Sequence, residues 1–170
     1  MQKAIFSRID LDGDSRTAED YMSCVKDIIK NSKVQKLTDH YQHCNTSRLQ
    51  HSINVSYYSF IICRRMGWDK SAAARAGLLH DLYFYNWRNK NGFRKSSHAS
   101  WHPRVAKDNA RKICALRPVE EDAILKHMWP MTIKPPRYKE AYVVCMTDKV
   151  CALFEFMGGQ GRRFKAKFAH

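Results

Sequence analysis

Apolar residues recur every three to four positions over most of the chain, which is the spacing of one face of an α-helix. The clearest helix is predicted over Arg48–Met66, where Gly67 follows in a position typical of a helix end. Further helices are predicted over residues 15–29, 34–44, 70–82, 102–116, 118–128 and 138–157. No convincing strand pair is indicated. The pattern therefore predicts an all-α fold, a bundle of about six to seven helices.

The chain length of 170 residues is typical of one domain with a core of its own. We predict a single helical domain over residues 1–160. Residues 161–170 contain Arg and Lys but little apolar periodicity, and we predict that they form a flexible basic tail. Residues 83–101 form a long aromatic and polar connection for which the sequence indicates no definite role.

The charge balance is the one unusual feature of the composition. The chain has 30 Lys and Arg against 16 Asp and Glu, a formal net charge of +14. Such a field attracts polyanions, including nucleotides, nucleic acids and acidic lipid surfaces, but charge alone selects none of them.

The cysteines and the hydropathy bear on the compartment. The six cysteines include no Cys-x-x-Cys pair, and several lie in apolar helical runs, as buried thiols in a reducing compartment do. No signal-type pattern and no uncharged apolar run of membrane-spanning length are present. We therefore expect a cytoplasmic protein without a membrane partner, and the sequence leaves its oligomeric state open.

The first candidate metal ligands lie in the apolar run over residues 72–84, which contains the adjacent pair His80 and Asp81. An imidazole and a carboxylate in an apolar wall cost free energy unless they are paired or bind a metal. One dipeptide cannot complete a metal shell, so further ligands are expected elsewhere.

Four other His and Asp residues also lie within or at the ends of predicted apolar helices. His51 lies at the edge of the buried face of Arg48–Met66, where a hydrogen-bonded core histidine is the common alternative to a ligand. His102 precedes Pro103 at a predicted helix start, and His127 is at a predicted helix end. Asp148 lies within an apolar helix, where a solvated face does not explain it.

The local sequences around these residues form a recognisable motif pattern. They read Arg-Leu-Gln-His-Ser at 48–52, Gly-Leu-Leu-His-Asp-Leu at 77–82 and Thr-Asp-Lys at 147–149. A lone His, a His-Asp pair and a distal Asp in this order resemble the HD-domain metal-dependent phosphohydrolase superfamily. The resemblance spans residues 48–154 and implies an HD-domain helical bundle.

The two intervening histidines resemble the two-metal branch of that superfamily, which includes bacterial diadenosine tetraphosphate hydrolases. The ligands of the first metal implied by this resemblance are His51, His80, Asp81 and Asp148. His102 and His127 would hold the second metal, with Asp81 as the bridge that also orients water. His98 is an alternative to His102, because both flank the predicted helix start.

These ligand types limit the metals and the chemistry. Imidazole and carboxylate suit iron, manganese, zinc, nickel or cobalt, and two such ions can activate a water for attack on phosphorus. Positive charge for the phosphate is expected from Lys149 and Arg48, although a solvent-facing lysine and a helix-start charge explain these two equally well.

The resemblance thus implies a metal-dependent phosphohydrolase that cleaves a phosphoester or phosphoanhydride of a nucleotide or small phosphorylated metabolite. The alternative is a basic nucleic-acid-binding helical module with a structural or vestigial metal site. Six candidate ligands favour the enzyme, because structural sites are closed by four. No nucleic-acid-binding motif accompanies the charge.

Overall fold

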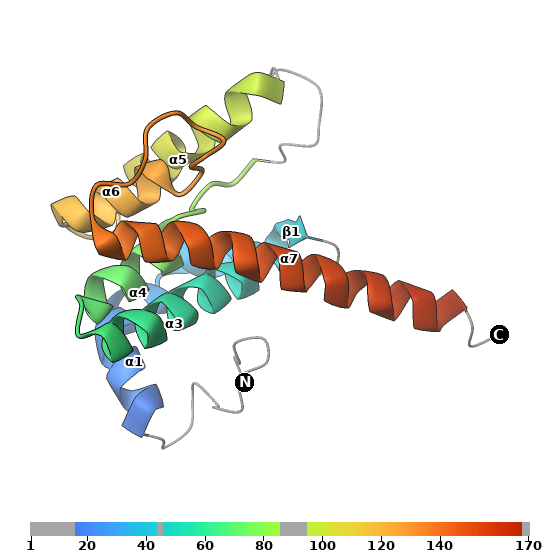
Figure 1. Ribbon diagram of the computed structural model, residues 1–170, viewed down its shortest axis with the longest axis horizontal. Helices are drawn as coiled ribbons and strands as arrows, with labels where there is room; N and C mark the ends of the chain where they lie inside the picture. The colour runs from blue at the N-terminus through green and yellow to red at the C-terminus, as the bar shows by residue number, and fades with distance from the viewer. Residues whose placement is uncertain (1–15, 44–45, 86–94, 168–170) are drawn as a thin grey trace.

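The computed structural model describes residues 16–43, 46–85 and 95–167. Within these ranges the chain forms α-helices, one 3-10 helix and a small antiparallel sheet (Figure 1). In chain order the elements are α1 (Arg16–Ile29), α2 (Ser32–Gln35), η1 (Lys36–Asp39), β1 (Tyr41–His43), β2 (Thr46–Ser47), α3 (Arg48–Met66), α4 (Lys70–Leu79), α5 (Lys95–Arg111), α6 (Pro118–Lys126) and α7 (Lys139–Lys167). The predicted all-α bundle is confirmed.

Two packed helices, α3 and α4, form the centre of this bundle. α7 packs against both of them, α1 packs on α4, and α6 lies between α4, α5 and α7. Figure 1 shows α7 crossing the bundle and extending beyond the other helices toward the C-terminus. Among the described helices, none is both long and apolar enough to cross a membrane. The packing brings the C-terminal ends of α4 and α6 close to the first turn of α3, where His51 lies, and to Asp148 of α7.

Local signals define the ends of α3 and the start of α4. The hydroxyl of Ser47 accepts a hydrogen bond from the backbone N–H of Gln50 (3.2 Å), which caps the first turn of α3. Gly67 ends α3 in the left-handed conformation, with φ of 66°. Asp69 then accepts from the N–H of Ala72 (2.8 Å) and caps α4. The predicted bounds of α3 are therefore confirmed.

The predicted start of the helix at His102 is wrong. α5 begins at Lys95, and Pro103 lies inside it rather than in its first turn. The prediction relied on the preference of proline for the first helical position, but a helix tolerates an interior proline where its packing compensates for one missing hydrogen bond. Part of the predicted connection over residues 83–101 is thus helical, and residues 86–94 lie outside the described part.

The single helix predicted over residues 34–44 is also wrong. The chain there forms α2 and then η1, after which His40 adopts an extended backbone. Tyr41–His43 pairs antiparallel with Thr46–Ser47, so that the segment folds back as a short hairpin before α3 begins. The paired residues, Tyr41 with Ser47 and His43 with Thr46, are close in the chain, and helical periodicity does not reveal pairing between such short strands.

At the C-terminus, α7 extends through residues 161–167, which belong to the predicted basic tail. Residues 168–170 of that tail lie outside the described part. The division of the chain at residue 160 stays a prediction.

The close approach of α3 and α4 predicts a large effect of Gly77→Ala. A Cβ at Gly77 would lie 2.7 Å from the Cα of Ser56 and 2.9 Å from its backbone N. Both neighbours are backbone atoms of α3, which can move only if the helix moves. We expect the variant to lower the free energy of unfolding by about 2 kcal/mol, because overpacking would force α4 away from α3. Urea denaturation would measure this effect.

The matched control is Gly158→Ala on α7, where an added Cβ meets no atom within 4 Å. That variant should be neutral or stabilising by up to about 1 kcal/mol, because alanine favours helix. Equal stabilities of the two variants would contradict the close-contact explanation.

Candidate metal centre

The structure brings all six predicted ligand residues into one buried cluster. They come from five helices: His51 from α3, His80 and Asp81 from the end of α4, His102 from α5, His127 from the end of α6 and Asp148 from α7. The side chain of Asp148 is 15% exposed and those of the other five are at most 4% exposed. Solvent therefore reaches the cluster mainly beside Asp148.

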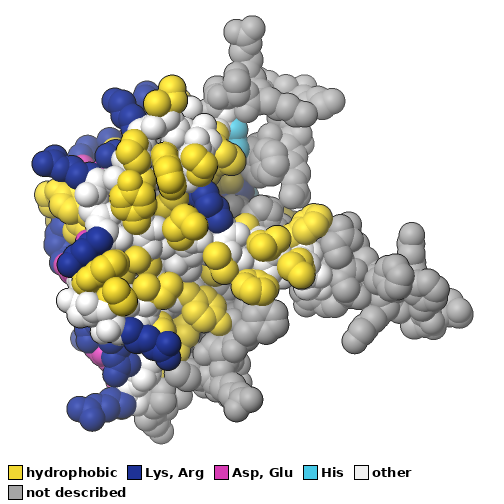
Figure 2. Space-filling model, in the orientation of Figure 1, with side chains coloured by type: hydrophobic (Ala, Val, Ile, Leu, Met, Phe, Trp, Pro, Cys, Tyr) yellow, Lys and Arg dark blue, Asp and Glu magenta, His cyan; other side chains and the backbone are white. Residues whose placement is uncertain are grey.

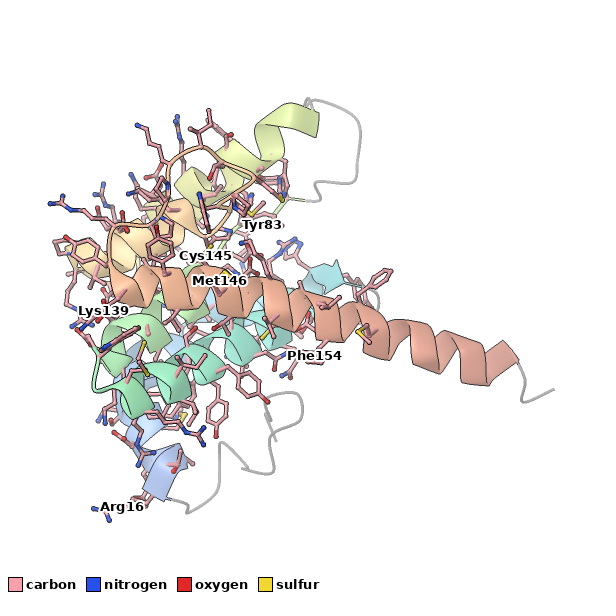
Figure 3. All side chains as sticks on the ribbon, viewed as in Figure 1. Arg16, Tyr83, Lys139, Cys145, Met146 and Phe154 are labelled. Carbon is pink, nitrogen blue, oxygen red and sulfur yellow. The ribbon has the colours of Figure 1, made fainter. Side chains whose placement is uncertain are left out.

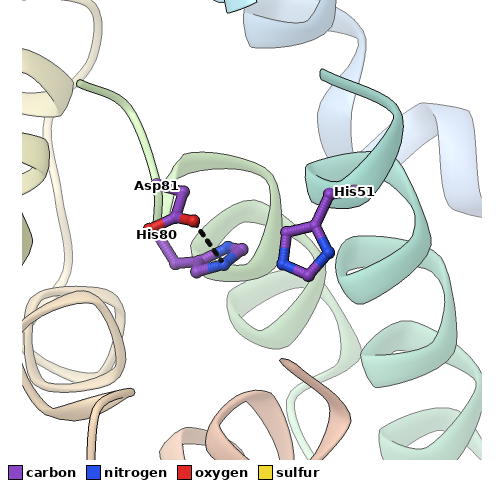
Figure 4. A group of neighbouring side chains, drawn as sticks. All are labelled: His51, His80 and Asp81. Atoms are coloured by element: carbon purple, nitrogen blue, oxygen red, sulfur yellow. Dashed lines mark ion pairs between the residues drawn. The ribbon is translucent and has the colours of Figure 1, made fainter. Parts of the chain in front are cut away.

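Asp148 joins the histidines of α3 and α4. Its Oδ1 lies 3.0 Å from Nε2 of His51 and 3.6 Å from Nε2 of His80. The rings of His51 and His80 face one another across the interface of α3 and α4, with centroids 5.4 Å apart (Figure 4). Together with Asp81, the two histidines can place one ligand atom each within 4.8 Å of one another, close enough to hold one ion.

The two carboxylate oxygens of Asp81 point to different histidines. Oδ2 lies 3.7 Å from Nε2 of His80, the ion pair drawn in Figure 4. Oδ1 lies 3.3 Å from Nε2 of His102 and 3.6 Å from Nε2 of His127. A second group that can hold an ion consists of Asp81, His102 and His127. Asp81 is thus the residue that both groups share.

The two groups are not separated cleanly. His127 also lies within ligand distance of His80 and Asp148, which makes a third possible group. The six side chains therefore form one continuous cluster, whose ligand atoms fall into more than one possible metal-binding group.

Backbone carbonyls fix the orientation of three histidine rings. Nδ1 of His80 lies 2.7 Å from the carbonyl oxygen of Gly77, and Nδ1 of His127 lies 2.8 Å from that of Ile124. His102 makes the same contact, 2.8 Å, with the carbonyl of His98. Because a carbonyl only accepts, Nδ1 must carry the proton, and the lone pair of a neutral ring is then on Nε2. All three Nε2 atoms face the cluster.

This arrangement fits a metal ion better than internal hydrogen bonding. Nε2 of His102 and Nε2 of His127 are 2.8 Å apart, although both neutral rings would present lone pairs there. Nε2 of His80 is buried and has no hydrogen-bond partner. A buried polar atom without a partner is costly. A divalent ion among these nitrogens would satisfy them, and the set of imidazoles and carboxylates suits transition metals.

The charges of the cluster support ligation by the carboxylates and by His127. Burial opposes ionisation of Asp81 and Asp148, but their histidine neighbours outweigh it and hold both pKa values well below the usual range. Burial, together with His102 and His80 nearby, lowers the pKa of His127 to about 3. His127 is therefore neutral at physiological pH, as a ligand must be.

His51 is held differently, by carboxylates on both sides. Burial disfavours its charged form, but hydrogen bonds with Asp148 and Glu155 outweigh burial and raise the pKa of His51 to about 10. Nδ1 of His51 lies 3.0 Å from Oε2 of Glu155, and Nε2 faces Asp148. A metal on Nε2 would replace a proton there, while Nδ1 would keep its proton and donate it in the hydrogen bond to Glu155.

Glu155 was not among the predicted site residues. Its side chain is fully buried, and its Oε1 accepts a hydrogen bond from Nδ2 of Asn54 (2.8 Å), one helical turn beyond His51. One signal was available in the sequence: Glu155 follows Asp148 by seven residues, two turns of α7, and is a second acid in an apolar helix.

Arg48 and Lys149 both bind backbone carbonyls. Arg48 is 1% exposed, donates from Nη1 to the carbonyl of Tyr83 (2.6 Å) and stacks 3.7 Å above the Tyr83 ring. Nζ of Lys149 donates to the carbonyls of His127 (2.7 Å) and Cys145 (3.1 Å). These contacts tie Arg48 to the segment after Asp81 and Lys149 to the end of α6. Their predicted role in binding phosphate stays a prediction.

His98 lies beside the cluster, on the far side of His102. The two rings are stacked, with centroids 4.5 Å apart, and Nδ1 of His98 lies 3.3 Å from the hydroxyl of Tyr85. Among the described residues, the groups that could hold an ion include His102 but not His98. The geometry thus favours His102 of the two.

A comparison with known protein families identifies the family to which the chain belongs. A family model for the HD domain matches residues 48–153, more than half of the chain, and the matched segment contains all six clustered residues. No curated protein and no solved structure matches the chain. The chain therefore belongs to the HD-domain family of metal-dependent phosphohydrolases.

Proposed function

We propose that this protein is a phosphohydrolase with two divalent transition metal ions, which cleaves a phosphoester or phosphoanhydride bond of a nucleotide or another small phosphorylated metabolite. The observation that carries the proposal is the position of Asp81. Its two oxygens face His80 on one side and His102 with His127 on the other, as a bridging carboxylate would. Iron, manganese, zinc, nickel and cobalt all suit the ligands.

The protein residues would act mainly by positioning. His51, His80, Asp81 and Asp148 would hold one ion, and His102 and His127 with Asp81 the other. When bound, such ions lower the pKa of a water and neutralise charge on phosphoryl oxygens. The carbonyls behind the histidine rings keep each Nε2 directed at the site, so little reorganisation is needed. Substrate would approach beside Asp148, the most exposed ligand.

The net charge of +14 supports an anionic substrate, since a positive field raises the local concentration of polyphosphates. It does not distinguish a nucleotide from a nucleic acid. The alternative, a nucleic-acid-binding module with a structural or vestigial metal site, leaves the shared position of Asp81 and the access beside Asp148 without a role.

The test is to purify the protein, determine its metal content by elemental analysis, and assay phosphate release from a panel of nucleotides and sugar phosphates with added Mn²⁺, Fe²⁺, Co²⁺, Ni²⁺ or Zn²⁺. We expect about two ions per chain and metal-dependent hydrolysis. A protein that stays metal-free after supplementation would refute the proposal. Metal binding without hydrolysis, combined with nucleic-acid binding that weakens steeply with salt, would favour the binding module.

We further propose that Glu155 is a positioning residue for His51, and predict the effect of Glu155→Gln. The carboxylate accepts from Nδ1 of His51 and from Asn54 at the same time, which keeps Nε2 of His51 directed at Asp148. A neutral amide makes His51 a weaker ligand. Metal affinity, measured by calorimetric titration of apoprotein with Mn²⁺, should fall about tenfold or more.

The matched control is Glu120→Gln. Glu120 is an equally buried carboxylate whose partners are Arg75 (3.2 Å) and Arg117 (2.9 Å). Its replacement should lower the free energy of unfolding without changing metal affinity. If Glu155→Gln binds Mn²⁺ as tightly as the wild type, Glu155 has only a packing role.

A further inference from the structure

The outward face of α7 is apolar over four helical turns. In the described stretch from Tyr142 to Gly158, every exposed side chain belongs to an apolar residue. These residues, with exposures between 39% and 58%, are Tyr142, Met146, Val150, Leu153, Phe154, Phe156 and Met157. Figure 2 shows hydrophobic side chains gathered along α7, and Figure 3 labels Met146 and Phe154 on this helix. We call these seven residues the α7 face.

The two acidic residues of the same stretch are directed inward, where Asp148 and Glu155 contact His51. Lys149 is partly exposed (32%), and its ammonium group donates to the carbonyl of His127. Over these turns, α7 is therefore apolar outside and polar where it touches the metal centre. This reverses the pattern of a helix on the surface of a monomer, whose outer face is polar. An outer face whose exposed residues are all apolar, with Lys149 only partly exposed, indicates a covered surface.

The composition of the α7 face favours a protein partner with a similarly apolar surface, such as a second copy of this chain. Aromatic residues and methionine, with no exposed charge, are typical of the centre of homodimer interfaces. Helices that lie on anionic membranes flank their apolar side with Lys and Arg, and the exposed positions from Tyr142 to Gly158 include neither.

We infer that the α7 face is the interface with a second copy of this chain. A helical ridge can pack against its own copy across a two-fold axis, the commonest symmetry of soluble oligomers. The seven side chains are each about half exposed, and at roughly 200 Å² for a fully exposed large side chain they supply on the order of 700 Å². A standard stable interface buries about 800 Å² per partner. Two strongly positive chains can also meet there, because the face carries no charge.

In such a dimer, one helix, α7, would contact both the partner chain and the metal centre. The outer face of α7 would contact the partner while its inner face places Asp148 and Glu155 against His51. The partner copy would thereby hold in place the helix that carries one predicted ligand and its neighbour.

The test is the mass of the full chain in solution at micromolar concentration, measured by light scattering after size exclusion and by sedimentation equilibrium. We expect twice the mass of one chain for the wild type, and the mass of one chain for Met146→Glu with Leu153→Glu. The conservative pair Met146→Leu with Leu153→Met should remain dimeric. Lys112→Glu, an exposed charge change outside α7, should also remain dimeric.

Circular dichroism of each variant would separate loss of pairing from loss of fold. Hydrogen exchange of the wild type provides a measurement without mutation: backbone amides of residues 142–157 should become more protected as chain concentration rises. A wild-type monomer, or a dimer that survives both glutamates, would overturn the inference. If instead a monomeric wild type binds phosphatidylserine vesicles, and the two glutamates on the α7 face abolish that binding, the partner is a membrane surface and the inference is overturned.

Discussion

Asp81→Asn is expected to remove most of the hydrolytic activity, by on the order of 1,000-fold or more, together with most of the bound metal. Asparagine has nearly the same shape as aspartate, but its neutral amide offers one oxygen and one NH₂ group. It therefore cannot present an anionic oxygen to His80 and another to His102 and His127 at once. Metal content by elemental analysis and the initial rate on the best substrate of the panel would measure both effects.

Asp20→Asn is the control for the loss of a carboxylate. Asp20 lies on α1 and pairs with Lys70 (2.6 Å), outside the metal centre. That variant should keep its metal and its rate, with a loss of stability of about 1 kcal/mol or less. If Asp81→Asn retained both ions and full activity, Asp81 would not bridge, and the two-metal proposal would lose its main support.

The residues of the cluster could be selected from the sequence because each is a costly burial. His80 and Asp81 interrupt an apolar run, and Asp148 lies in an apolar helix, so burial of these side chains is costly unless each has a polar partner. In the structure these side chains lie beside one another and beside His51, His102 and His127. The distances between them depend on how α3, α4, α6 and α7 pack, which no local spacing determines.

Helix ends were predictable where one side chain decides them. Ser47 and Asp69 accept capping hydrogen bonds, and Gly67 adopts a positive φ, so these boundaries follow from short-range chemistry. Pro103 shows the limit of such signals, because the same residue that often begins a helix lies within α5. Whether proline begins or interrupts a helix depends on the packing around it.

Glu155 shows why residues around the ligands are harder to predict than the ligands themselves. A glutamate on the last helix of a basic chain is usually exposed, and its burial follows from the packing of α7 against α3, where His51 and Asn54 lie. The same packing leaves the outer side of α7 apolar. The two faces of one helix thus follow from contacts that the sequence pattern alone does not specify.

His102→Ala and His98→Ala form the second decisive pair, since each removes one of two stacked imidazoles. His102→Ala is expected to reduce the metal content to about one ion per chain and the hydrolysis rate on the order of 100-fold, because it removes Nε2 from the group shared with Asp81 and His127. His51, His80 and Asp148 remain to hold the first ion. Elemental analysis after reconstitution with Mn²⁺, with the rate measured on the same samples, would show both effects.

His98→Ala removes a ring but keeps the backbone carbonyl that accepts from Nδ1 of His102 (2.8 Å), so the orientation of His102 should survive. Burial and the neighbouring His102 lower the pKa of His98 to about 4, which makes it a neutral ring at physiological pH and a chemically possible ligand. Geometry therefore has to decide between them. Two ions and a nearly unchanged rate in His98→Ala would establish His102 as the ligand, whereas the reverse outcome would assign the second ion to His98, beside the hydroxyl of Tyr85.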